Sequence, residues 1–307
     1  MTTDSAYEWA RVSALPRVHA VSGSGAGVMP GSGLDPNWLA DASTRWMELT
    51  LEQIPVWQTR VSDAYLRWSV TDRALCASRC DAAMMAGTYE VTGLRPGAKN
   101  FERTPLVAWS PQTAVERHDA ALSSAMRLAM REMVDEIERS ALQAFEILLL
   151  KGPHSVLERP TERGLKRIYQ RRAENPDGWA KSWSTFMVNW RRSQTQSDAS
   201  KLVSWYWSDA QLFMAGGYDR DALQQVNAFV AVLQAVRDHI SEGHGRAQPR
   251  LARLSAGVDS PDFSFDEGAA LEITRGQLEL VEAFYAEYLR MLTMSLKQKS
   301  TAAPMPV

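Results

Sequence analysis

The amino-acid sequence predicts an all-α fold, an irregular or elongated bundle of about seven or eight helices with a flexible N-terminal tail. Apolar residues recur every three or four positions along most of the chain, which is the period of an α-helix. Only TYEV and PLVAW, within residues 87–111, read as strands, so this segment is expected to form at most one small β-hairpin, with a long loop as an equal alternative. A hydrophobic content of 45% and a charged content of 23% in 307 residues are typical of a globular protein with a packed core.

The beginning of the chain differs in composition from the rest. The run SGSGAGVMPGSG consists almost entirely of glycine, serine and other small residues, which is typical of a flexible segment. It does not form a dinucleotide-binding fingerprint, because Val28 or Pro30 stands where a glycine is needed and no strand precedes it. The expected organisation is a flexible tail over 1–34, a helical domain over 35–299 with a candidate sub-boundary near 152–160, and a disordered tail over 300–307.

A first helix is expected over about 36–53, since Asp35 or Asn37 can cap it and Pro36 suits the first helical position. Pro55 lacks the N–H that would bond to the preceding turn, and its ring crowds that turn. A kink or a restart of the helix is therefore predicted at this proline, with a second helical piece after it.

Three tryptophans, Trp46, Trp57 and Trp68, recur at intervals of eleven residues in this region. That interval corresponds to about 3.67 residues per turn, so the three side chains would stack on one face of a nearly straight helix. Such a stripe either packs into the core, which is the favoured interpretation, or faces a partner.

The helices expected next are long and amphipathic. One should span about 113–151 and end at Gly152 and Pro153, because apolar residues recur along it every three or four positions. Four more are expected at about 161–173, 177–193, 199–214 and 219–241. The polar stretch EGHGRAQPRLARLSAGVDSPDFSFDEG is interpreted as a break, and a last long helix is expected at about 267–298.

That last helix carries the most regular pattern in the chain. One set of positions recurs at intervals of seven, with a complementary set between them: Leu271, Leu278, Tyr285 and Leu292, then Thr274, Val281, Tyr288 and Ser295. Four such heptads indicate a helix that packs against another helix. The pattern does not decide whether that helix belongs to the same chain or to another copy.

Charge and ligand-forming residues exclude several classes of protein. A net charge of -2 argues against chain-wide attraction to nucleic acid or to an anionic membrane. No segment approaches eighteen consecutive apolar residues, so no transmembrane helix is expected. None of the five histidines follows a glutamate by three residues, as a di-iron bundle requires, and Cys76 and Cys80 alone do not complete a zinc site. We expect no metal, no cofactor and a cytoplasmic location, with export by a signal-peptide-independent route left open.

The tract 159–192 combines cationic and aromatic side chains, which are the ingredients of single-strand nucleic-acid binding. Its candidate anion contacts are Arg163, Lys166, Arg167, Arg171, Arg172, Arg191 and Arg192. Four of its aromatic residues, however, share one face of one predicted helix, and such a stripe is more typical of a core: Trp179, Trp183, Phe186 and Trp190. Nucleic-acid binding is therefore an alternative and not the favoured function.

Aromatic residues also raise the expectation of a protein partner. Trp205 and Trp207 lie two positions apart on a predicted helix and must point to different sides, so one of them can meet a partner. Eleven tryptophans are many for this length, and tryptophan is enriched at interface anchors. The candidate interaction residues are Trp46, Trp57, Trp68, Trp205, Trp207, Leu271, Leu278, Val281, Tyr285, Tyr288 and Leu292.

These patterns favour a non-enzymatic structural, assembly or protein-interaction subunit, whose amphipathic, tryptophan-rich helices associate with copies of itself or with another protein. Three alternatives stay open: a nucleic-acid-binding helical protein using tract 159–192, a secreted helical protein of a bacterial export machine with an uncleaved N-terminal signal, and an all-helical enzyme or enzyme subunit with an organic cofactor.

Overall fold

The structure is a computed structural model of the 307-residue chain. It describes residues 38–84, 87–97, 100–149, 167, 169–171, 173–194, 199–215, 218, 220–258 and 260–302. The expected tail over 1–34 and the candidate sub-boundary near 152–160 lie outside these residues, as does most of the helix expected over 161–173. The described part confirms the predicted fold class, a largely helical and elongated bundle with one small β-hairpin.

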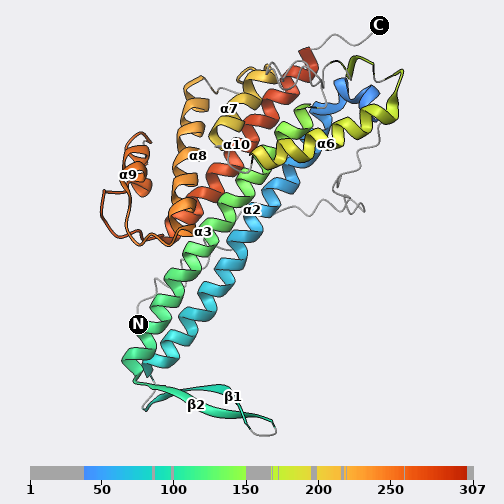
Figure 1. Ribbon diagram of the computed structural model, residues 1–307. Coiled ribbons are helices and arrows are strands. Elements are labelled where there is room, and N and C mark those ends of the chain that lie inside the picture. The colour runs from blue at the N-terminus through green and yellow to red at the C-terminus, as the bar shows by residue number, and fades with distance from the viewer. Residues whose placement is uncertain are drawn as a thin grey trace.

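Two long helices, α2 (Trp38–Met84) and α3 (Pro111–Leu149), run side by side through most of the molecule (Figure 1). At a rise of 1.5 Å per residue they extend about 70 and 58 Å. A hairpin of β1 (Tyr89–Pro96) and β2 (Phe101–Trp109) joins them at one end. We call the lower part of the pair, residues 69–84 and 111–128, the stalk.

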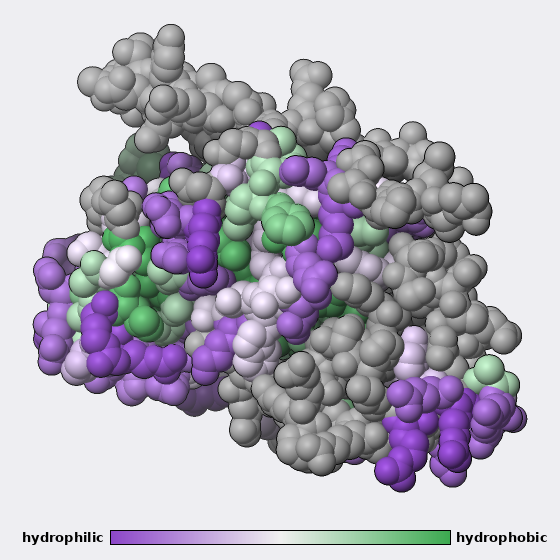
Figure 2. All heavy atoms as spheres, turned by 90° about the horizontal axis from the view of Figure 1, so that it is seen from above, coloured by the Kyte–Doolittle hydropathy of each residue, from purple (hydrophilic) through white to green (hydrophobic). Residues whose placement is uncertain are grey.

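The remaining helices gather around the other end of the long pair and form the body (Figure 1). Their bounds are α6 (Pro176–Gln194), α7 (Ala199–Asp209), α8 (Arg220–Ser241), α9 (Pro249–Ser255) and α10 (Arg275–Ala302), with a 3-10 turn η2 (Pro261–Phe263). One continuous core joins buried side chains from α2, α3, α7, α8 and α10. Figure 2, seen from above, shows hydrophilic side chains along part of the periphery and hydrophobic ones between them.

Of the kink or restart predicted at Pro55, the restart is wrong, because α2 is helical without interruption from Trp38 to Met84. The proline itself lies exposed on the surface of the helix. Ile54 and Trp57, on either side of it, are both buried in the core. Their burial offsets the roughly 3 kcal/mol that a proline costs in a helix interior.

The expected start of the last helix near residue 267 is also wrong, because α10 begins at Arg275. A reciprocal capping box sets this start: the N–H of Gln277 donates to Thr274 Oγ1 at 3.2 Å, and the N–H of Thr274 donates to Gln277 Oε1 at 2.9 Å. Leu271 therefore lies before the helix, although it is buried. The first of the four heptads is not helical.

The polar stretch before α10 is more ordered than the sequence indicated, since it contains α9 and η2. Its few apolar residues reach the core: Leu251, Phe263 and Phe265 are buried. The ring of Phe263 meets that of Phe229 on α8 edge-on, with centroids 4.8 Å apart.

A further difference concerns α7, which ends at Asp209 and not near 214, because Gln211 adopts a positive φ of 50°.

Candidate interaction surface

The tryptophan stripe of α2 is buried in the core of the protein and does not lie on its surface. Trp46, Trp57 and Trp68 are each buried in the core. The Trp46 ring meets Tyr206 of α7 edge-on at 6.4 Å, and Trp57 Nε1 donates to Gln143 Oε1 of α3 at 2.8 Å. The stripe is therefore the seam along which α2 packs on the other helices.

The heptad positions of the last helix face the same core. Leu278, Val281, Tyr285, Tyr288 and Leu292 are all buried, as is Leu271 before the helix. The Tyr285 hydroxyl donates to Ser140 Oγ of α3 at 2.5 Å, and burial raises the pKa of this tyrosine. In this structure the helical partner of α10 is thus supplied by α2 and α3 of the same chain.

The two neighbouring tryptophans of α7 do point to different sides, since Trp207 is buried and Trp205 is 37% exposed.

The basic tract 159–192 is only partly described. Arg167 and Arg171 are exposed, whereas Arg163, Lys166 and Arg172 lie outside the described residues, as do the side chains of Arg191 and Arg192. Trp179 and Trp183, which would have to stack on bases, are buried.

A network of hydrogen bonds and ion pairs joins α3 to α8. Arg237 Nη1 lies 2.7 Å from Glu138 Oε2 and 3.2 Å from Asp135 Oδ1, and its Nε donates to Asp238 Oδ1 at 2.9 Å. Gln234 Nε2 donates to the other Glu138 oxygen at 2.9 Å. Burial raises the pKa of Glu138, against the opposing effects of Gln234 and Arg237. These groups satisfy one another, so the network is structural.

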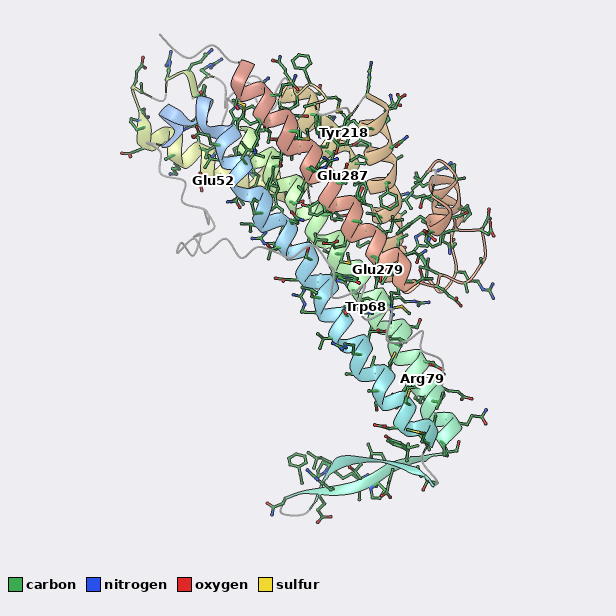
Figure 3. All side chains as sticks on the ribbon, turned by 180° about the vertical axis from the view of Figure 1, so that it is seen from behind. Glu52, Trp68, Arg79, Tyr218, Glu279 and Glu287 are labelled. Atoms are coloured by element: carbon green, nitrogen blue, oxygen red, sulfur yellow. The ribbon has the colours of Figure 1, made fainter. Side chains whose placement is uncertain are left out.

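A second polar cluster joins the start of α10 to α2. Arg275 Nη2 lies 2.5 Å from Oδ2 of the buried Asp72, and the guanidinium stands over the Trp68 ring, 5.9 Å from its centroid. One turn further along α10, Glu279 accepts a hydrogen bond of 3.4 Å from Tyr65 (Figure 3). Burial and the neighbouring Glu279 carboxylate raise the pKa of Tyr65 to about 12.

A serine and a histidine on the stalk resemble part of a nucleophilic pair. The Ser78 hydroxyl lies 2.8 Å from His118 Nε2, and His118 Nδ1 lies 2.7 Å from the Ala114 carbonyl oxygen. Acyl transfer also needs N–H donors for an oxyanion. Ser78 and His118 are in the interiors of α2 and α3, where the backbone N–H groups bond within the helix. We therefore interpret the contact between Ser78 and His118 as a hydrogen bond that links α2 to α3.

Neither a group of metal-binding side chains nor a membrane-spanning helix occurs in the part of the chain that the structure describes. Its histidine, cysteine, aspartate and glutamate residues form no group of three that could hold a metal ion. Among its helices, none combines the length and apolar character needed to cross a membrane.

The hairpin at the end of the stalk is the most exposed apolar element of the described chain. Its strands pair antiparallel from Tyr89 with Trp109 to Pro96 with Phe101, with a bulge opposite Val91 and Thr92. Its exposed large apolar side chains are Leu94, Phe101, Leu106 and Val107. A globular protein normally buries at least one face of such a hairpin, because two strands alone are marginally stable in water.

Local packing fixes the shape of this hairpin. Leu106, in the bulged part of β2, lies directly over Gly93 of β1: a Cβ added at Gly93 would be 2.3 Å from Leu106 Cδ1. A larger residue at this position would displace the exposed Leu106 side chain. At the base, Arg117 of α3 stands over the Trp109 ring, 5.8 Å from its centroid, and ties β2 to the stalk.

The sequence allowed either a small hairpin or a long loop here, and it did not predict that the hairpin is exposed. The strand pattern gives no signal for this exposure, because it does not show whether another element of the fold covers a face of the hairpin.

Comparison with known proteins adds no family assignment. No protein-family model matches the chain, and neither the curated proteins nor the solved structures gave a significant match.

Proposed function

We propose that the protein is a non-enzymatic assembly or protein-interaction subunit that presents the β-hairpin at the end of its stalk to another protein. The observation that carries this proposal is the contrast between the two ends of the molecule. The body encloses Trp46, Trp57, Trp68 and the α10 heptad residues, whereas the hairpin leaves Leu94 and Phe101 66% and 71% exposed. Exposed large apolar side chains that gather on one element are typical of interaction sites.

The chemistry of the hairpin favours a protein partner. Its apolar side chains alternate with Glu90, Arg95, Glu102 and Arg103, so neither sign of charge dominates. A mixed surface of this kind suits a protein interface, in which an apolar centre is surrounded by polar groups. Burying each large apolar side chain would contribute about 2 kcal/mol. The open strand edges add a second mode of recognition, by pairing with a strand of the partner.

The nucleic-acid alternative is less well supported. Stacking on bases needs exposed aromatic rings beside the cationic side chains. Trp179 and Trp183 are buried next to each other and to Tyr169, with ring centroids 5.4 and 5.3 Å from Trp179.

Affinity recovery from the source cells tests the proposal. The full chain is compared with a variant in which Leu94, Phe101 and Leu106 are changed to serine. We expect the full chain to recover a specific protein that the triple variant loses at least about tenfold, because three anchors are removed. Phe213→Ser, at a side chain that is 74% exposed on the body, is the matched control and should recover that protein unchanged. Equal recovery by the full chain and the triple variant would rule out the hairpin as the contact.

A further inference from the structure

The two edges of the hairpin differ in the backbone groups that they offer to another strand. The N–H of Gly97 donates to the carbonyl oxygen of Asn100 at 2.8 Å, which closes the turn with a hydrogen-bonded pair. In an antiparallel ladder such pairs alternate with pairs whose N–H and C=O groups point outward. Counting back from the turn through the register gives the outward positions: Pro96, Leu94, Thr92 and Glu90 on β1, and Phe101, Arg103 and Pro105 on β2.

The prolines of the hairpin agree with this assignment. Pro96 and Pro105 both occupy outward positions, where the N–H that proline lacks is not needed by the opposite strand. Pro105 therefore interrupts the outer edge of β2, and the bulge at Leu106 bends the strand directly after it. Because the extra residue of the bulge is in β2, the alternation along β1 is unbroken, and Glu90, Thr92 and Leu94 each offer an outward N–H and C=O.

The outer edge of β1 is also accessible. Glu90, Thr92 and Leu94 are exposed. The contact with the stalk is made by β2, where Arg117 of α3 stands over the Trp109 ring. Figure 1 and Figure 3 show the hairpin projecting from the end of the stalk, with no helix or strand of the described chain alongside its length.

We propose that an extended strand of the partner protein adds to the outer edge of β1 and runs antiparallel to it. This inference rests on the hairpin function proposed above and names its mode of recognition. The backbone of the added strand exchanges hydrogen bonds with Glu90, Thr92 and Leu94, which turns the hairpin into a three-stranded sheet. The antiparallel direction is the more stable pairing per residue.

The side chains of the hairpin define the chemistry of the added strand, because residues directly opposite each other share a face of the sheet. Glu90 has the uncharged Ala108 opposite it within the hairpin, so its complement on the added strand is a basic residue. Leu94 favours an apolar residue. On the other face Leu106 lies over Gly93, so an aromatic residue opposite Gly93 packs against Leu106. From its N-terminus the added strand therefore carries an apolar residue, then an aromatic one, and a basic residue three positions later.

Titration calorimetry of the full chain with a synthetic peptide of this pattern, acetyl-Glu-Ile-Phe-Thr-Val-Lys-Ser-amide, tests the backbone pairing. We expect saturable binding with a Kd below about 1 mM. N-methylation at the isoleucine, threonine and lysine removes the N–H groups that face β1 and should weaken binding at least about tenfold. N-methylation at the phenylalanine and valine, whose N–H groups point away from β1, is the matched control and should change binding by less than about twofold. No binding of the unmodified peptide, or equal effects of the two modifications, would overturn the proposal.

Variants of the chain test the assignment to β1. Thr92→Pro removes an outward N–H from β1 and should weaken binding of the same peptide about fivefold or more. Arg103→Pro makes the same change at an outward position of β2 and should leave binding unchanged. Glu90→Lys should weaken binding about threefold or more, and a peptide with glutamate in place of its lysine should restore it. Equal losses in the two proline variants would overturn the assignment.

The hairpin function and the strand addition can fail separately. Equal recovery of cellular protein by the full chain and the hairpin serine variant would contradict the function. Peptide binding that does not distinguish the two N-methylated forms would contradict the strand addition alone.

Discussion

Trp57 Nε1 donates a hydrogen bond of 2.8 Å to Gln143 Oε1, across the contact between α2 and α3 and 86 residues away in sequence. The same amide oxygen accepts from Arg60 at 3.4 Å. The middle tryptophan of the α2 stripe is thus fixed by packing and by a polar anchor, and it belongs to the core of the chain.

Trp57→Ala should therefore destabilise the fold. We expect a loss of about 3–5 kcal/mol in the free energy of unfolding, from lost burial, the cavity and the lost hydrogen bond to Gln143. Urea denaturation measures it. Val56→Ala, a half-exposed neighbour on the same helix, is the control and should change stability by less than about 1 kcal/mol. A Trp57→Ala protein as stable as the control would place this side chain outside the core.

The ion pair between Asp72 and Arg275 predicts a compensating double variant. Arg275→Met leaves the buried Asp72 carboxylate without its counterion and should cost about 1–3 kcal/mol. Asp72→Asn removes that charge, so the double variant should recover a large part of the loss. If the loss in the double variant equalled the sum of the losses in the two single variants, Asp72 and Arg275 would not be coupled.

The start of α10 depends on its capping box. Thr274→Ala should lower the free energy of unfolding by about 1 kcal/mol, because the N–H of Gln277 loses its acceptor. Thr274→Ser retains a hydroxyl and should be nearly neutral. If alanine and serine behaved alike in thermal melts, the threonine hydroxyl would not be what fixes the start of the helix.

Buried tyrosines predict a loss of stability at alkaline pH. Burial raises the pKa of Tyr288 from 10.0 to about 12, so the folded chain holds this proton more tightly than the unfolded chain. The raised pKa contributes about 3 kcal/mol to the free energy of unfolding. This contribution is fully present below pH 10 and is lost as the pH rises through 12. Urea melts at pH 8 and 11 should show the loss, and Tyr288→Phe should reduce the pH dependence. Identical pH dependence in both proteins would be the contrary result.

The sequence predicted the helical class and the core role favoured for Trp46, Trp57 and Trp68, because their spacing matches the helical period along one face. It failed on the helix restart at Pro55, where burial on both sides outweighs a lost hydrogen bond. It also failed at the start of α10, because the apolar pattern continues one turn before the capping box. The exposed hairpin could not be identified, since strand patterns do not reveal whether another element covers them.

The central claim, that the hairpin is a contact element and not part of the core, is tested most directly by photo-cross-linking in the source cells. A photoreactive phenylalanine analogue replaces Phe101 in one protein and Phe213, similarly exposed on the body, in another. The account predicts a discrete protein adduct from position 101 and none from position 213. A folded protein that gives no adduct at 101, or the same adducts at both positions, would contradict it.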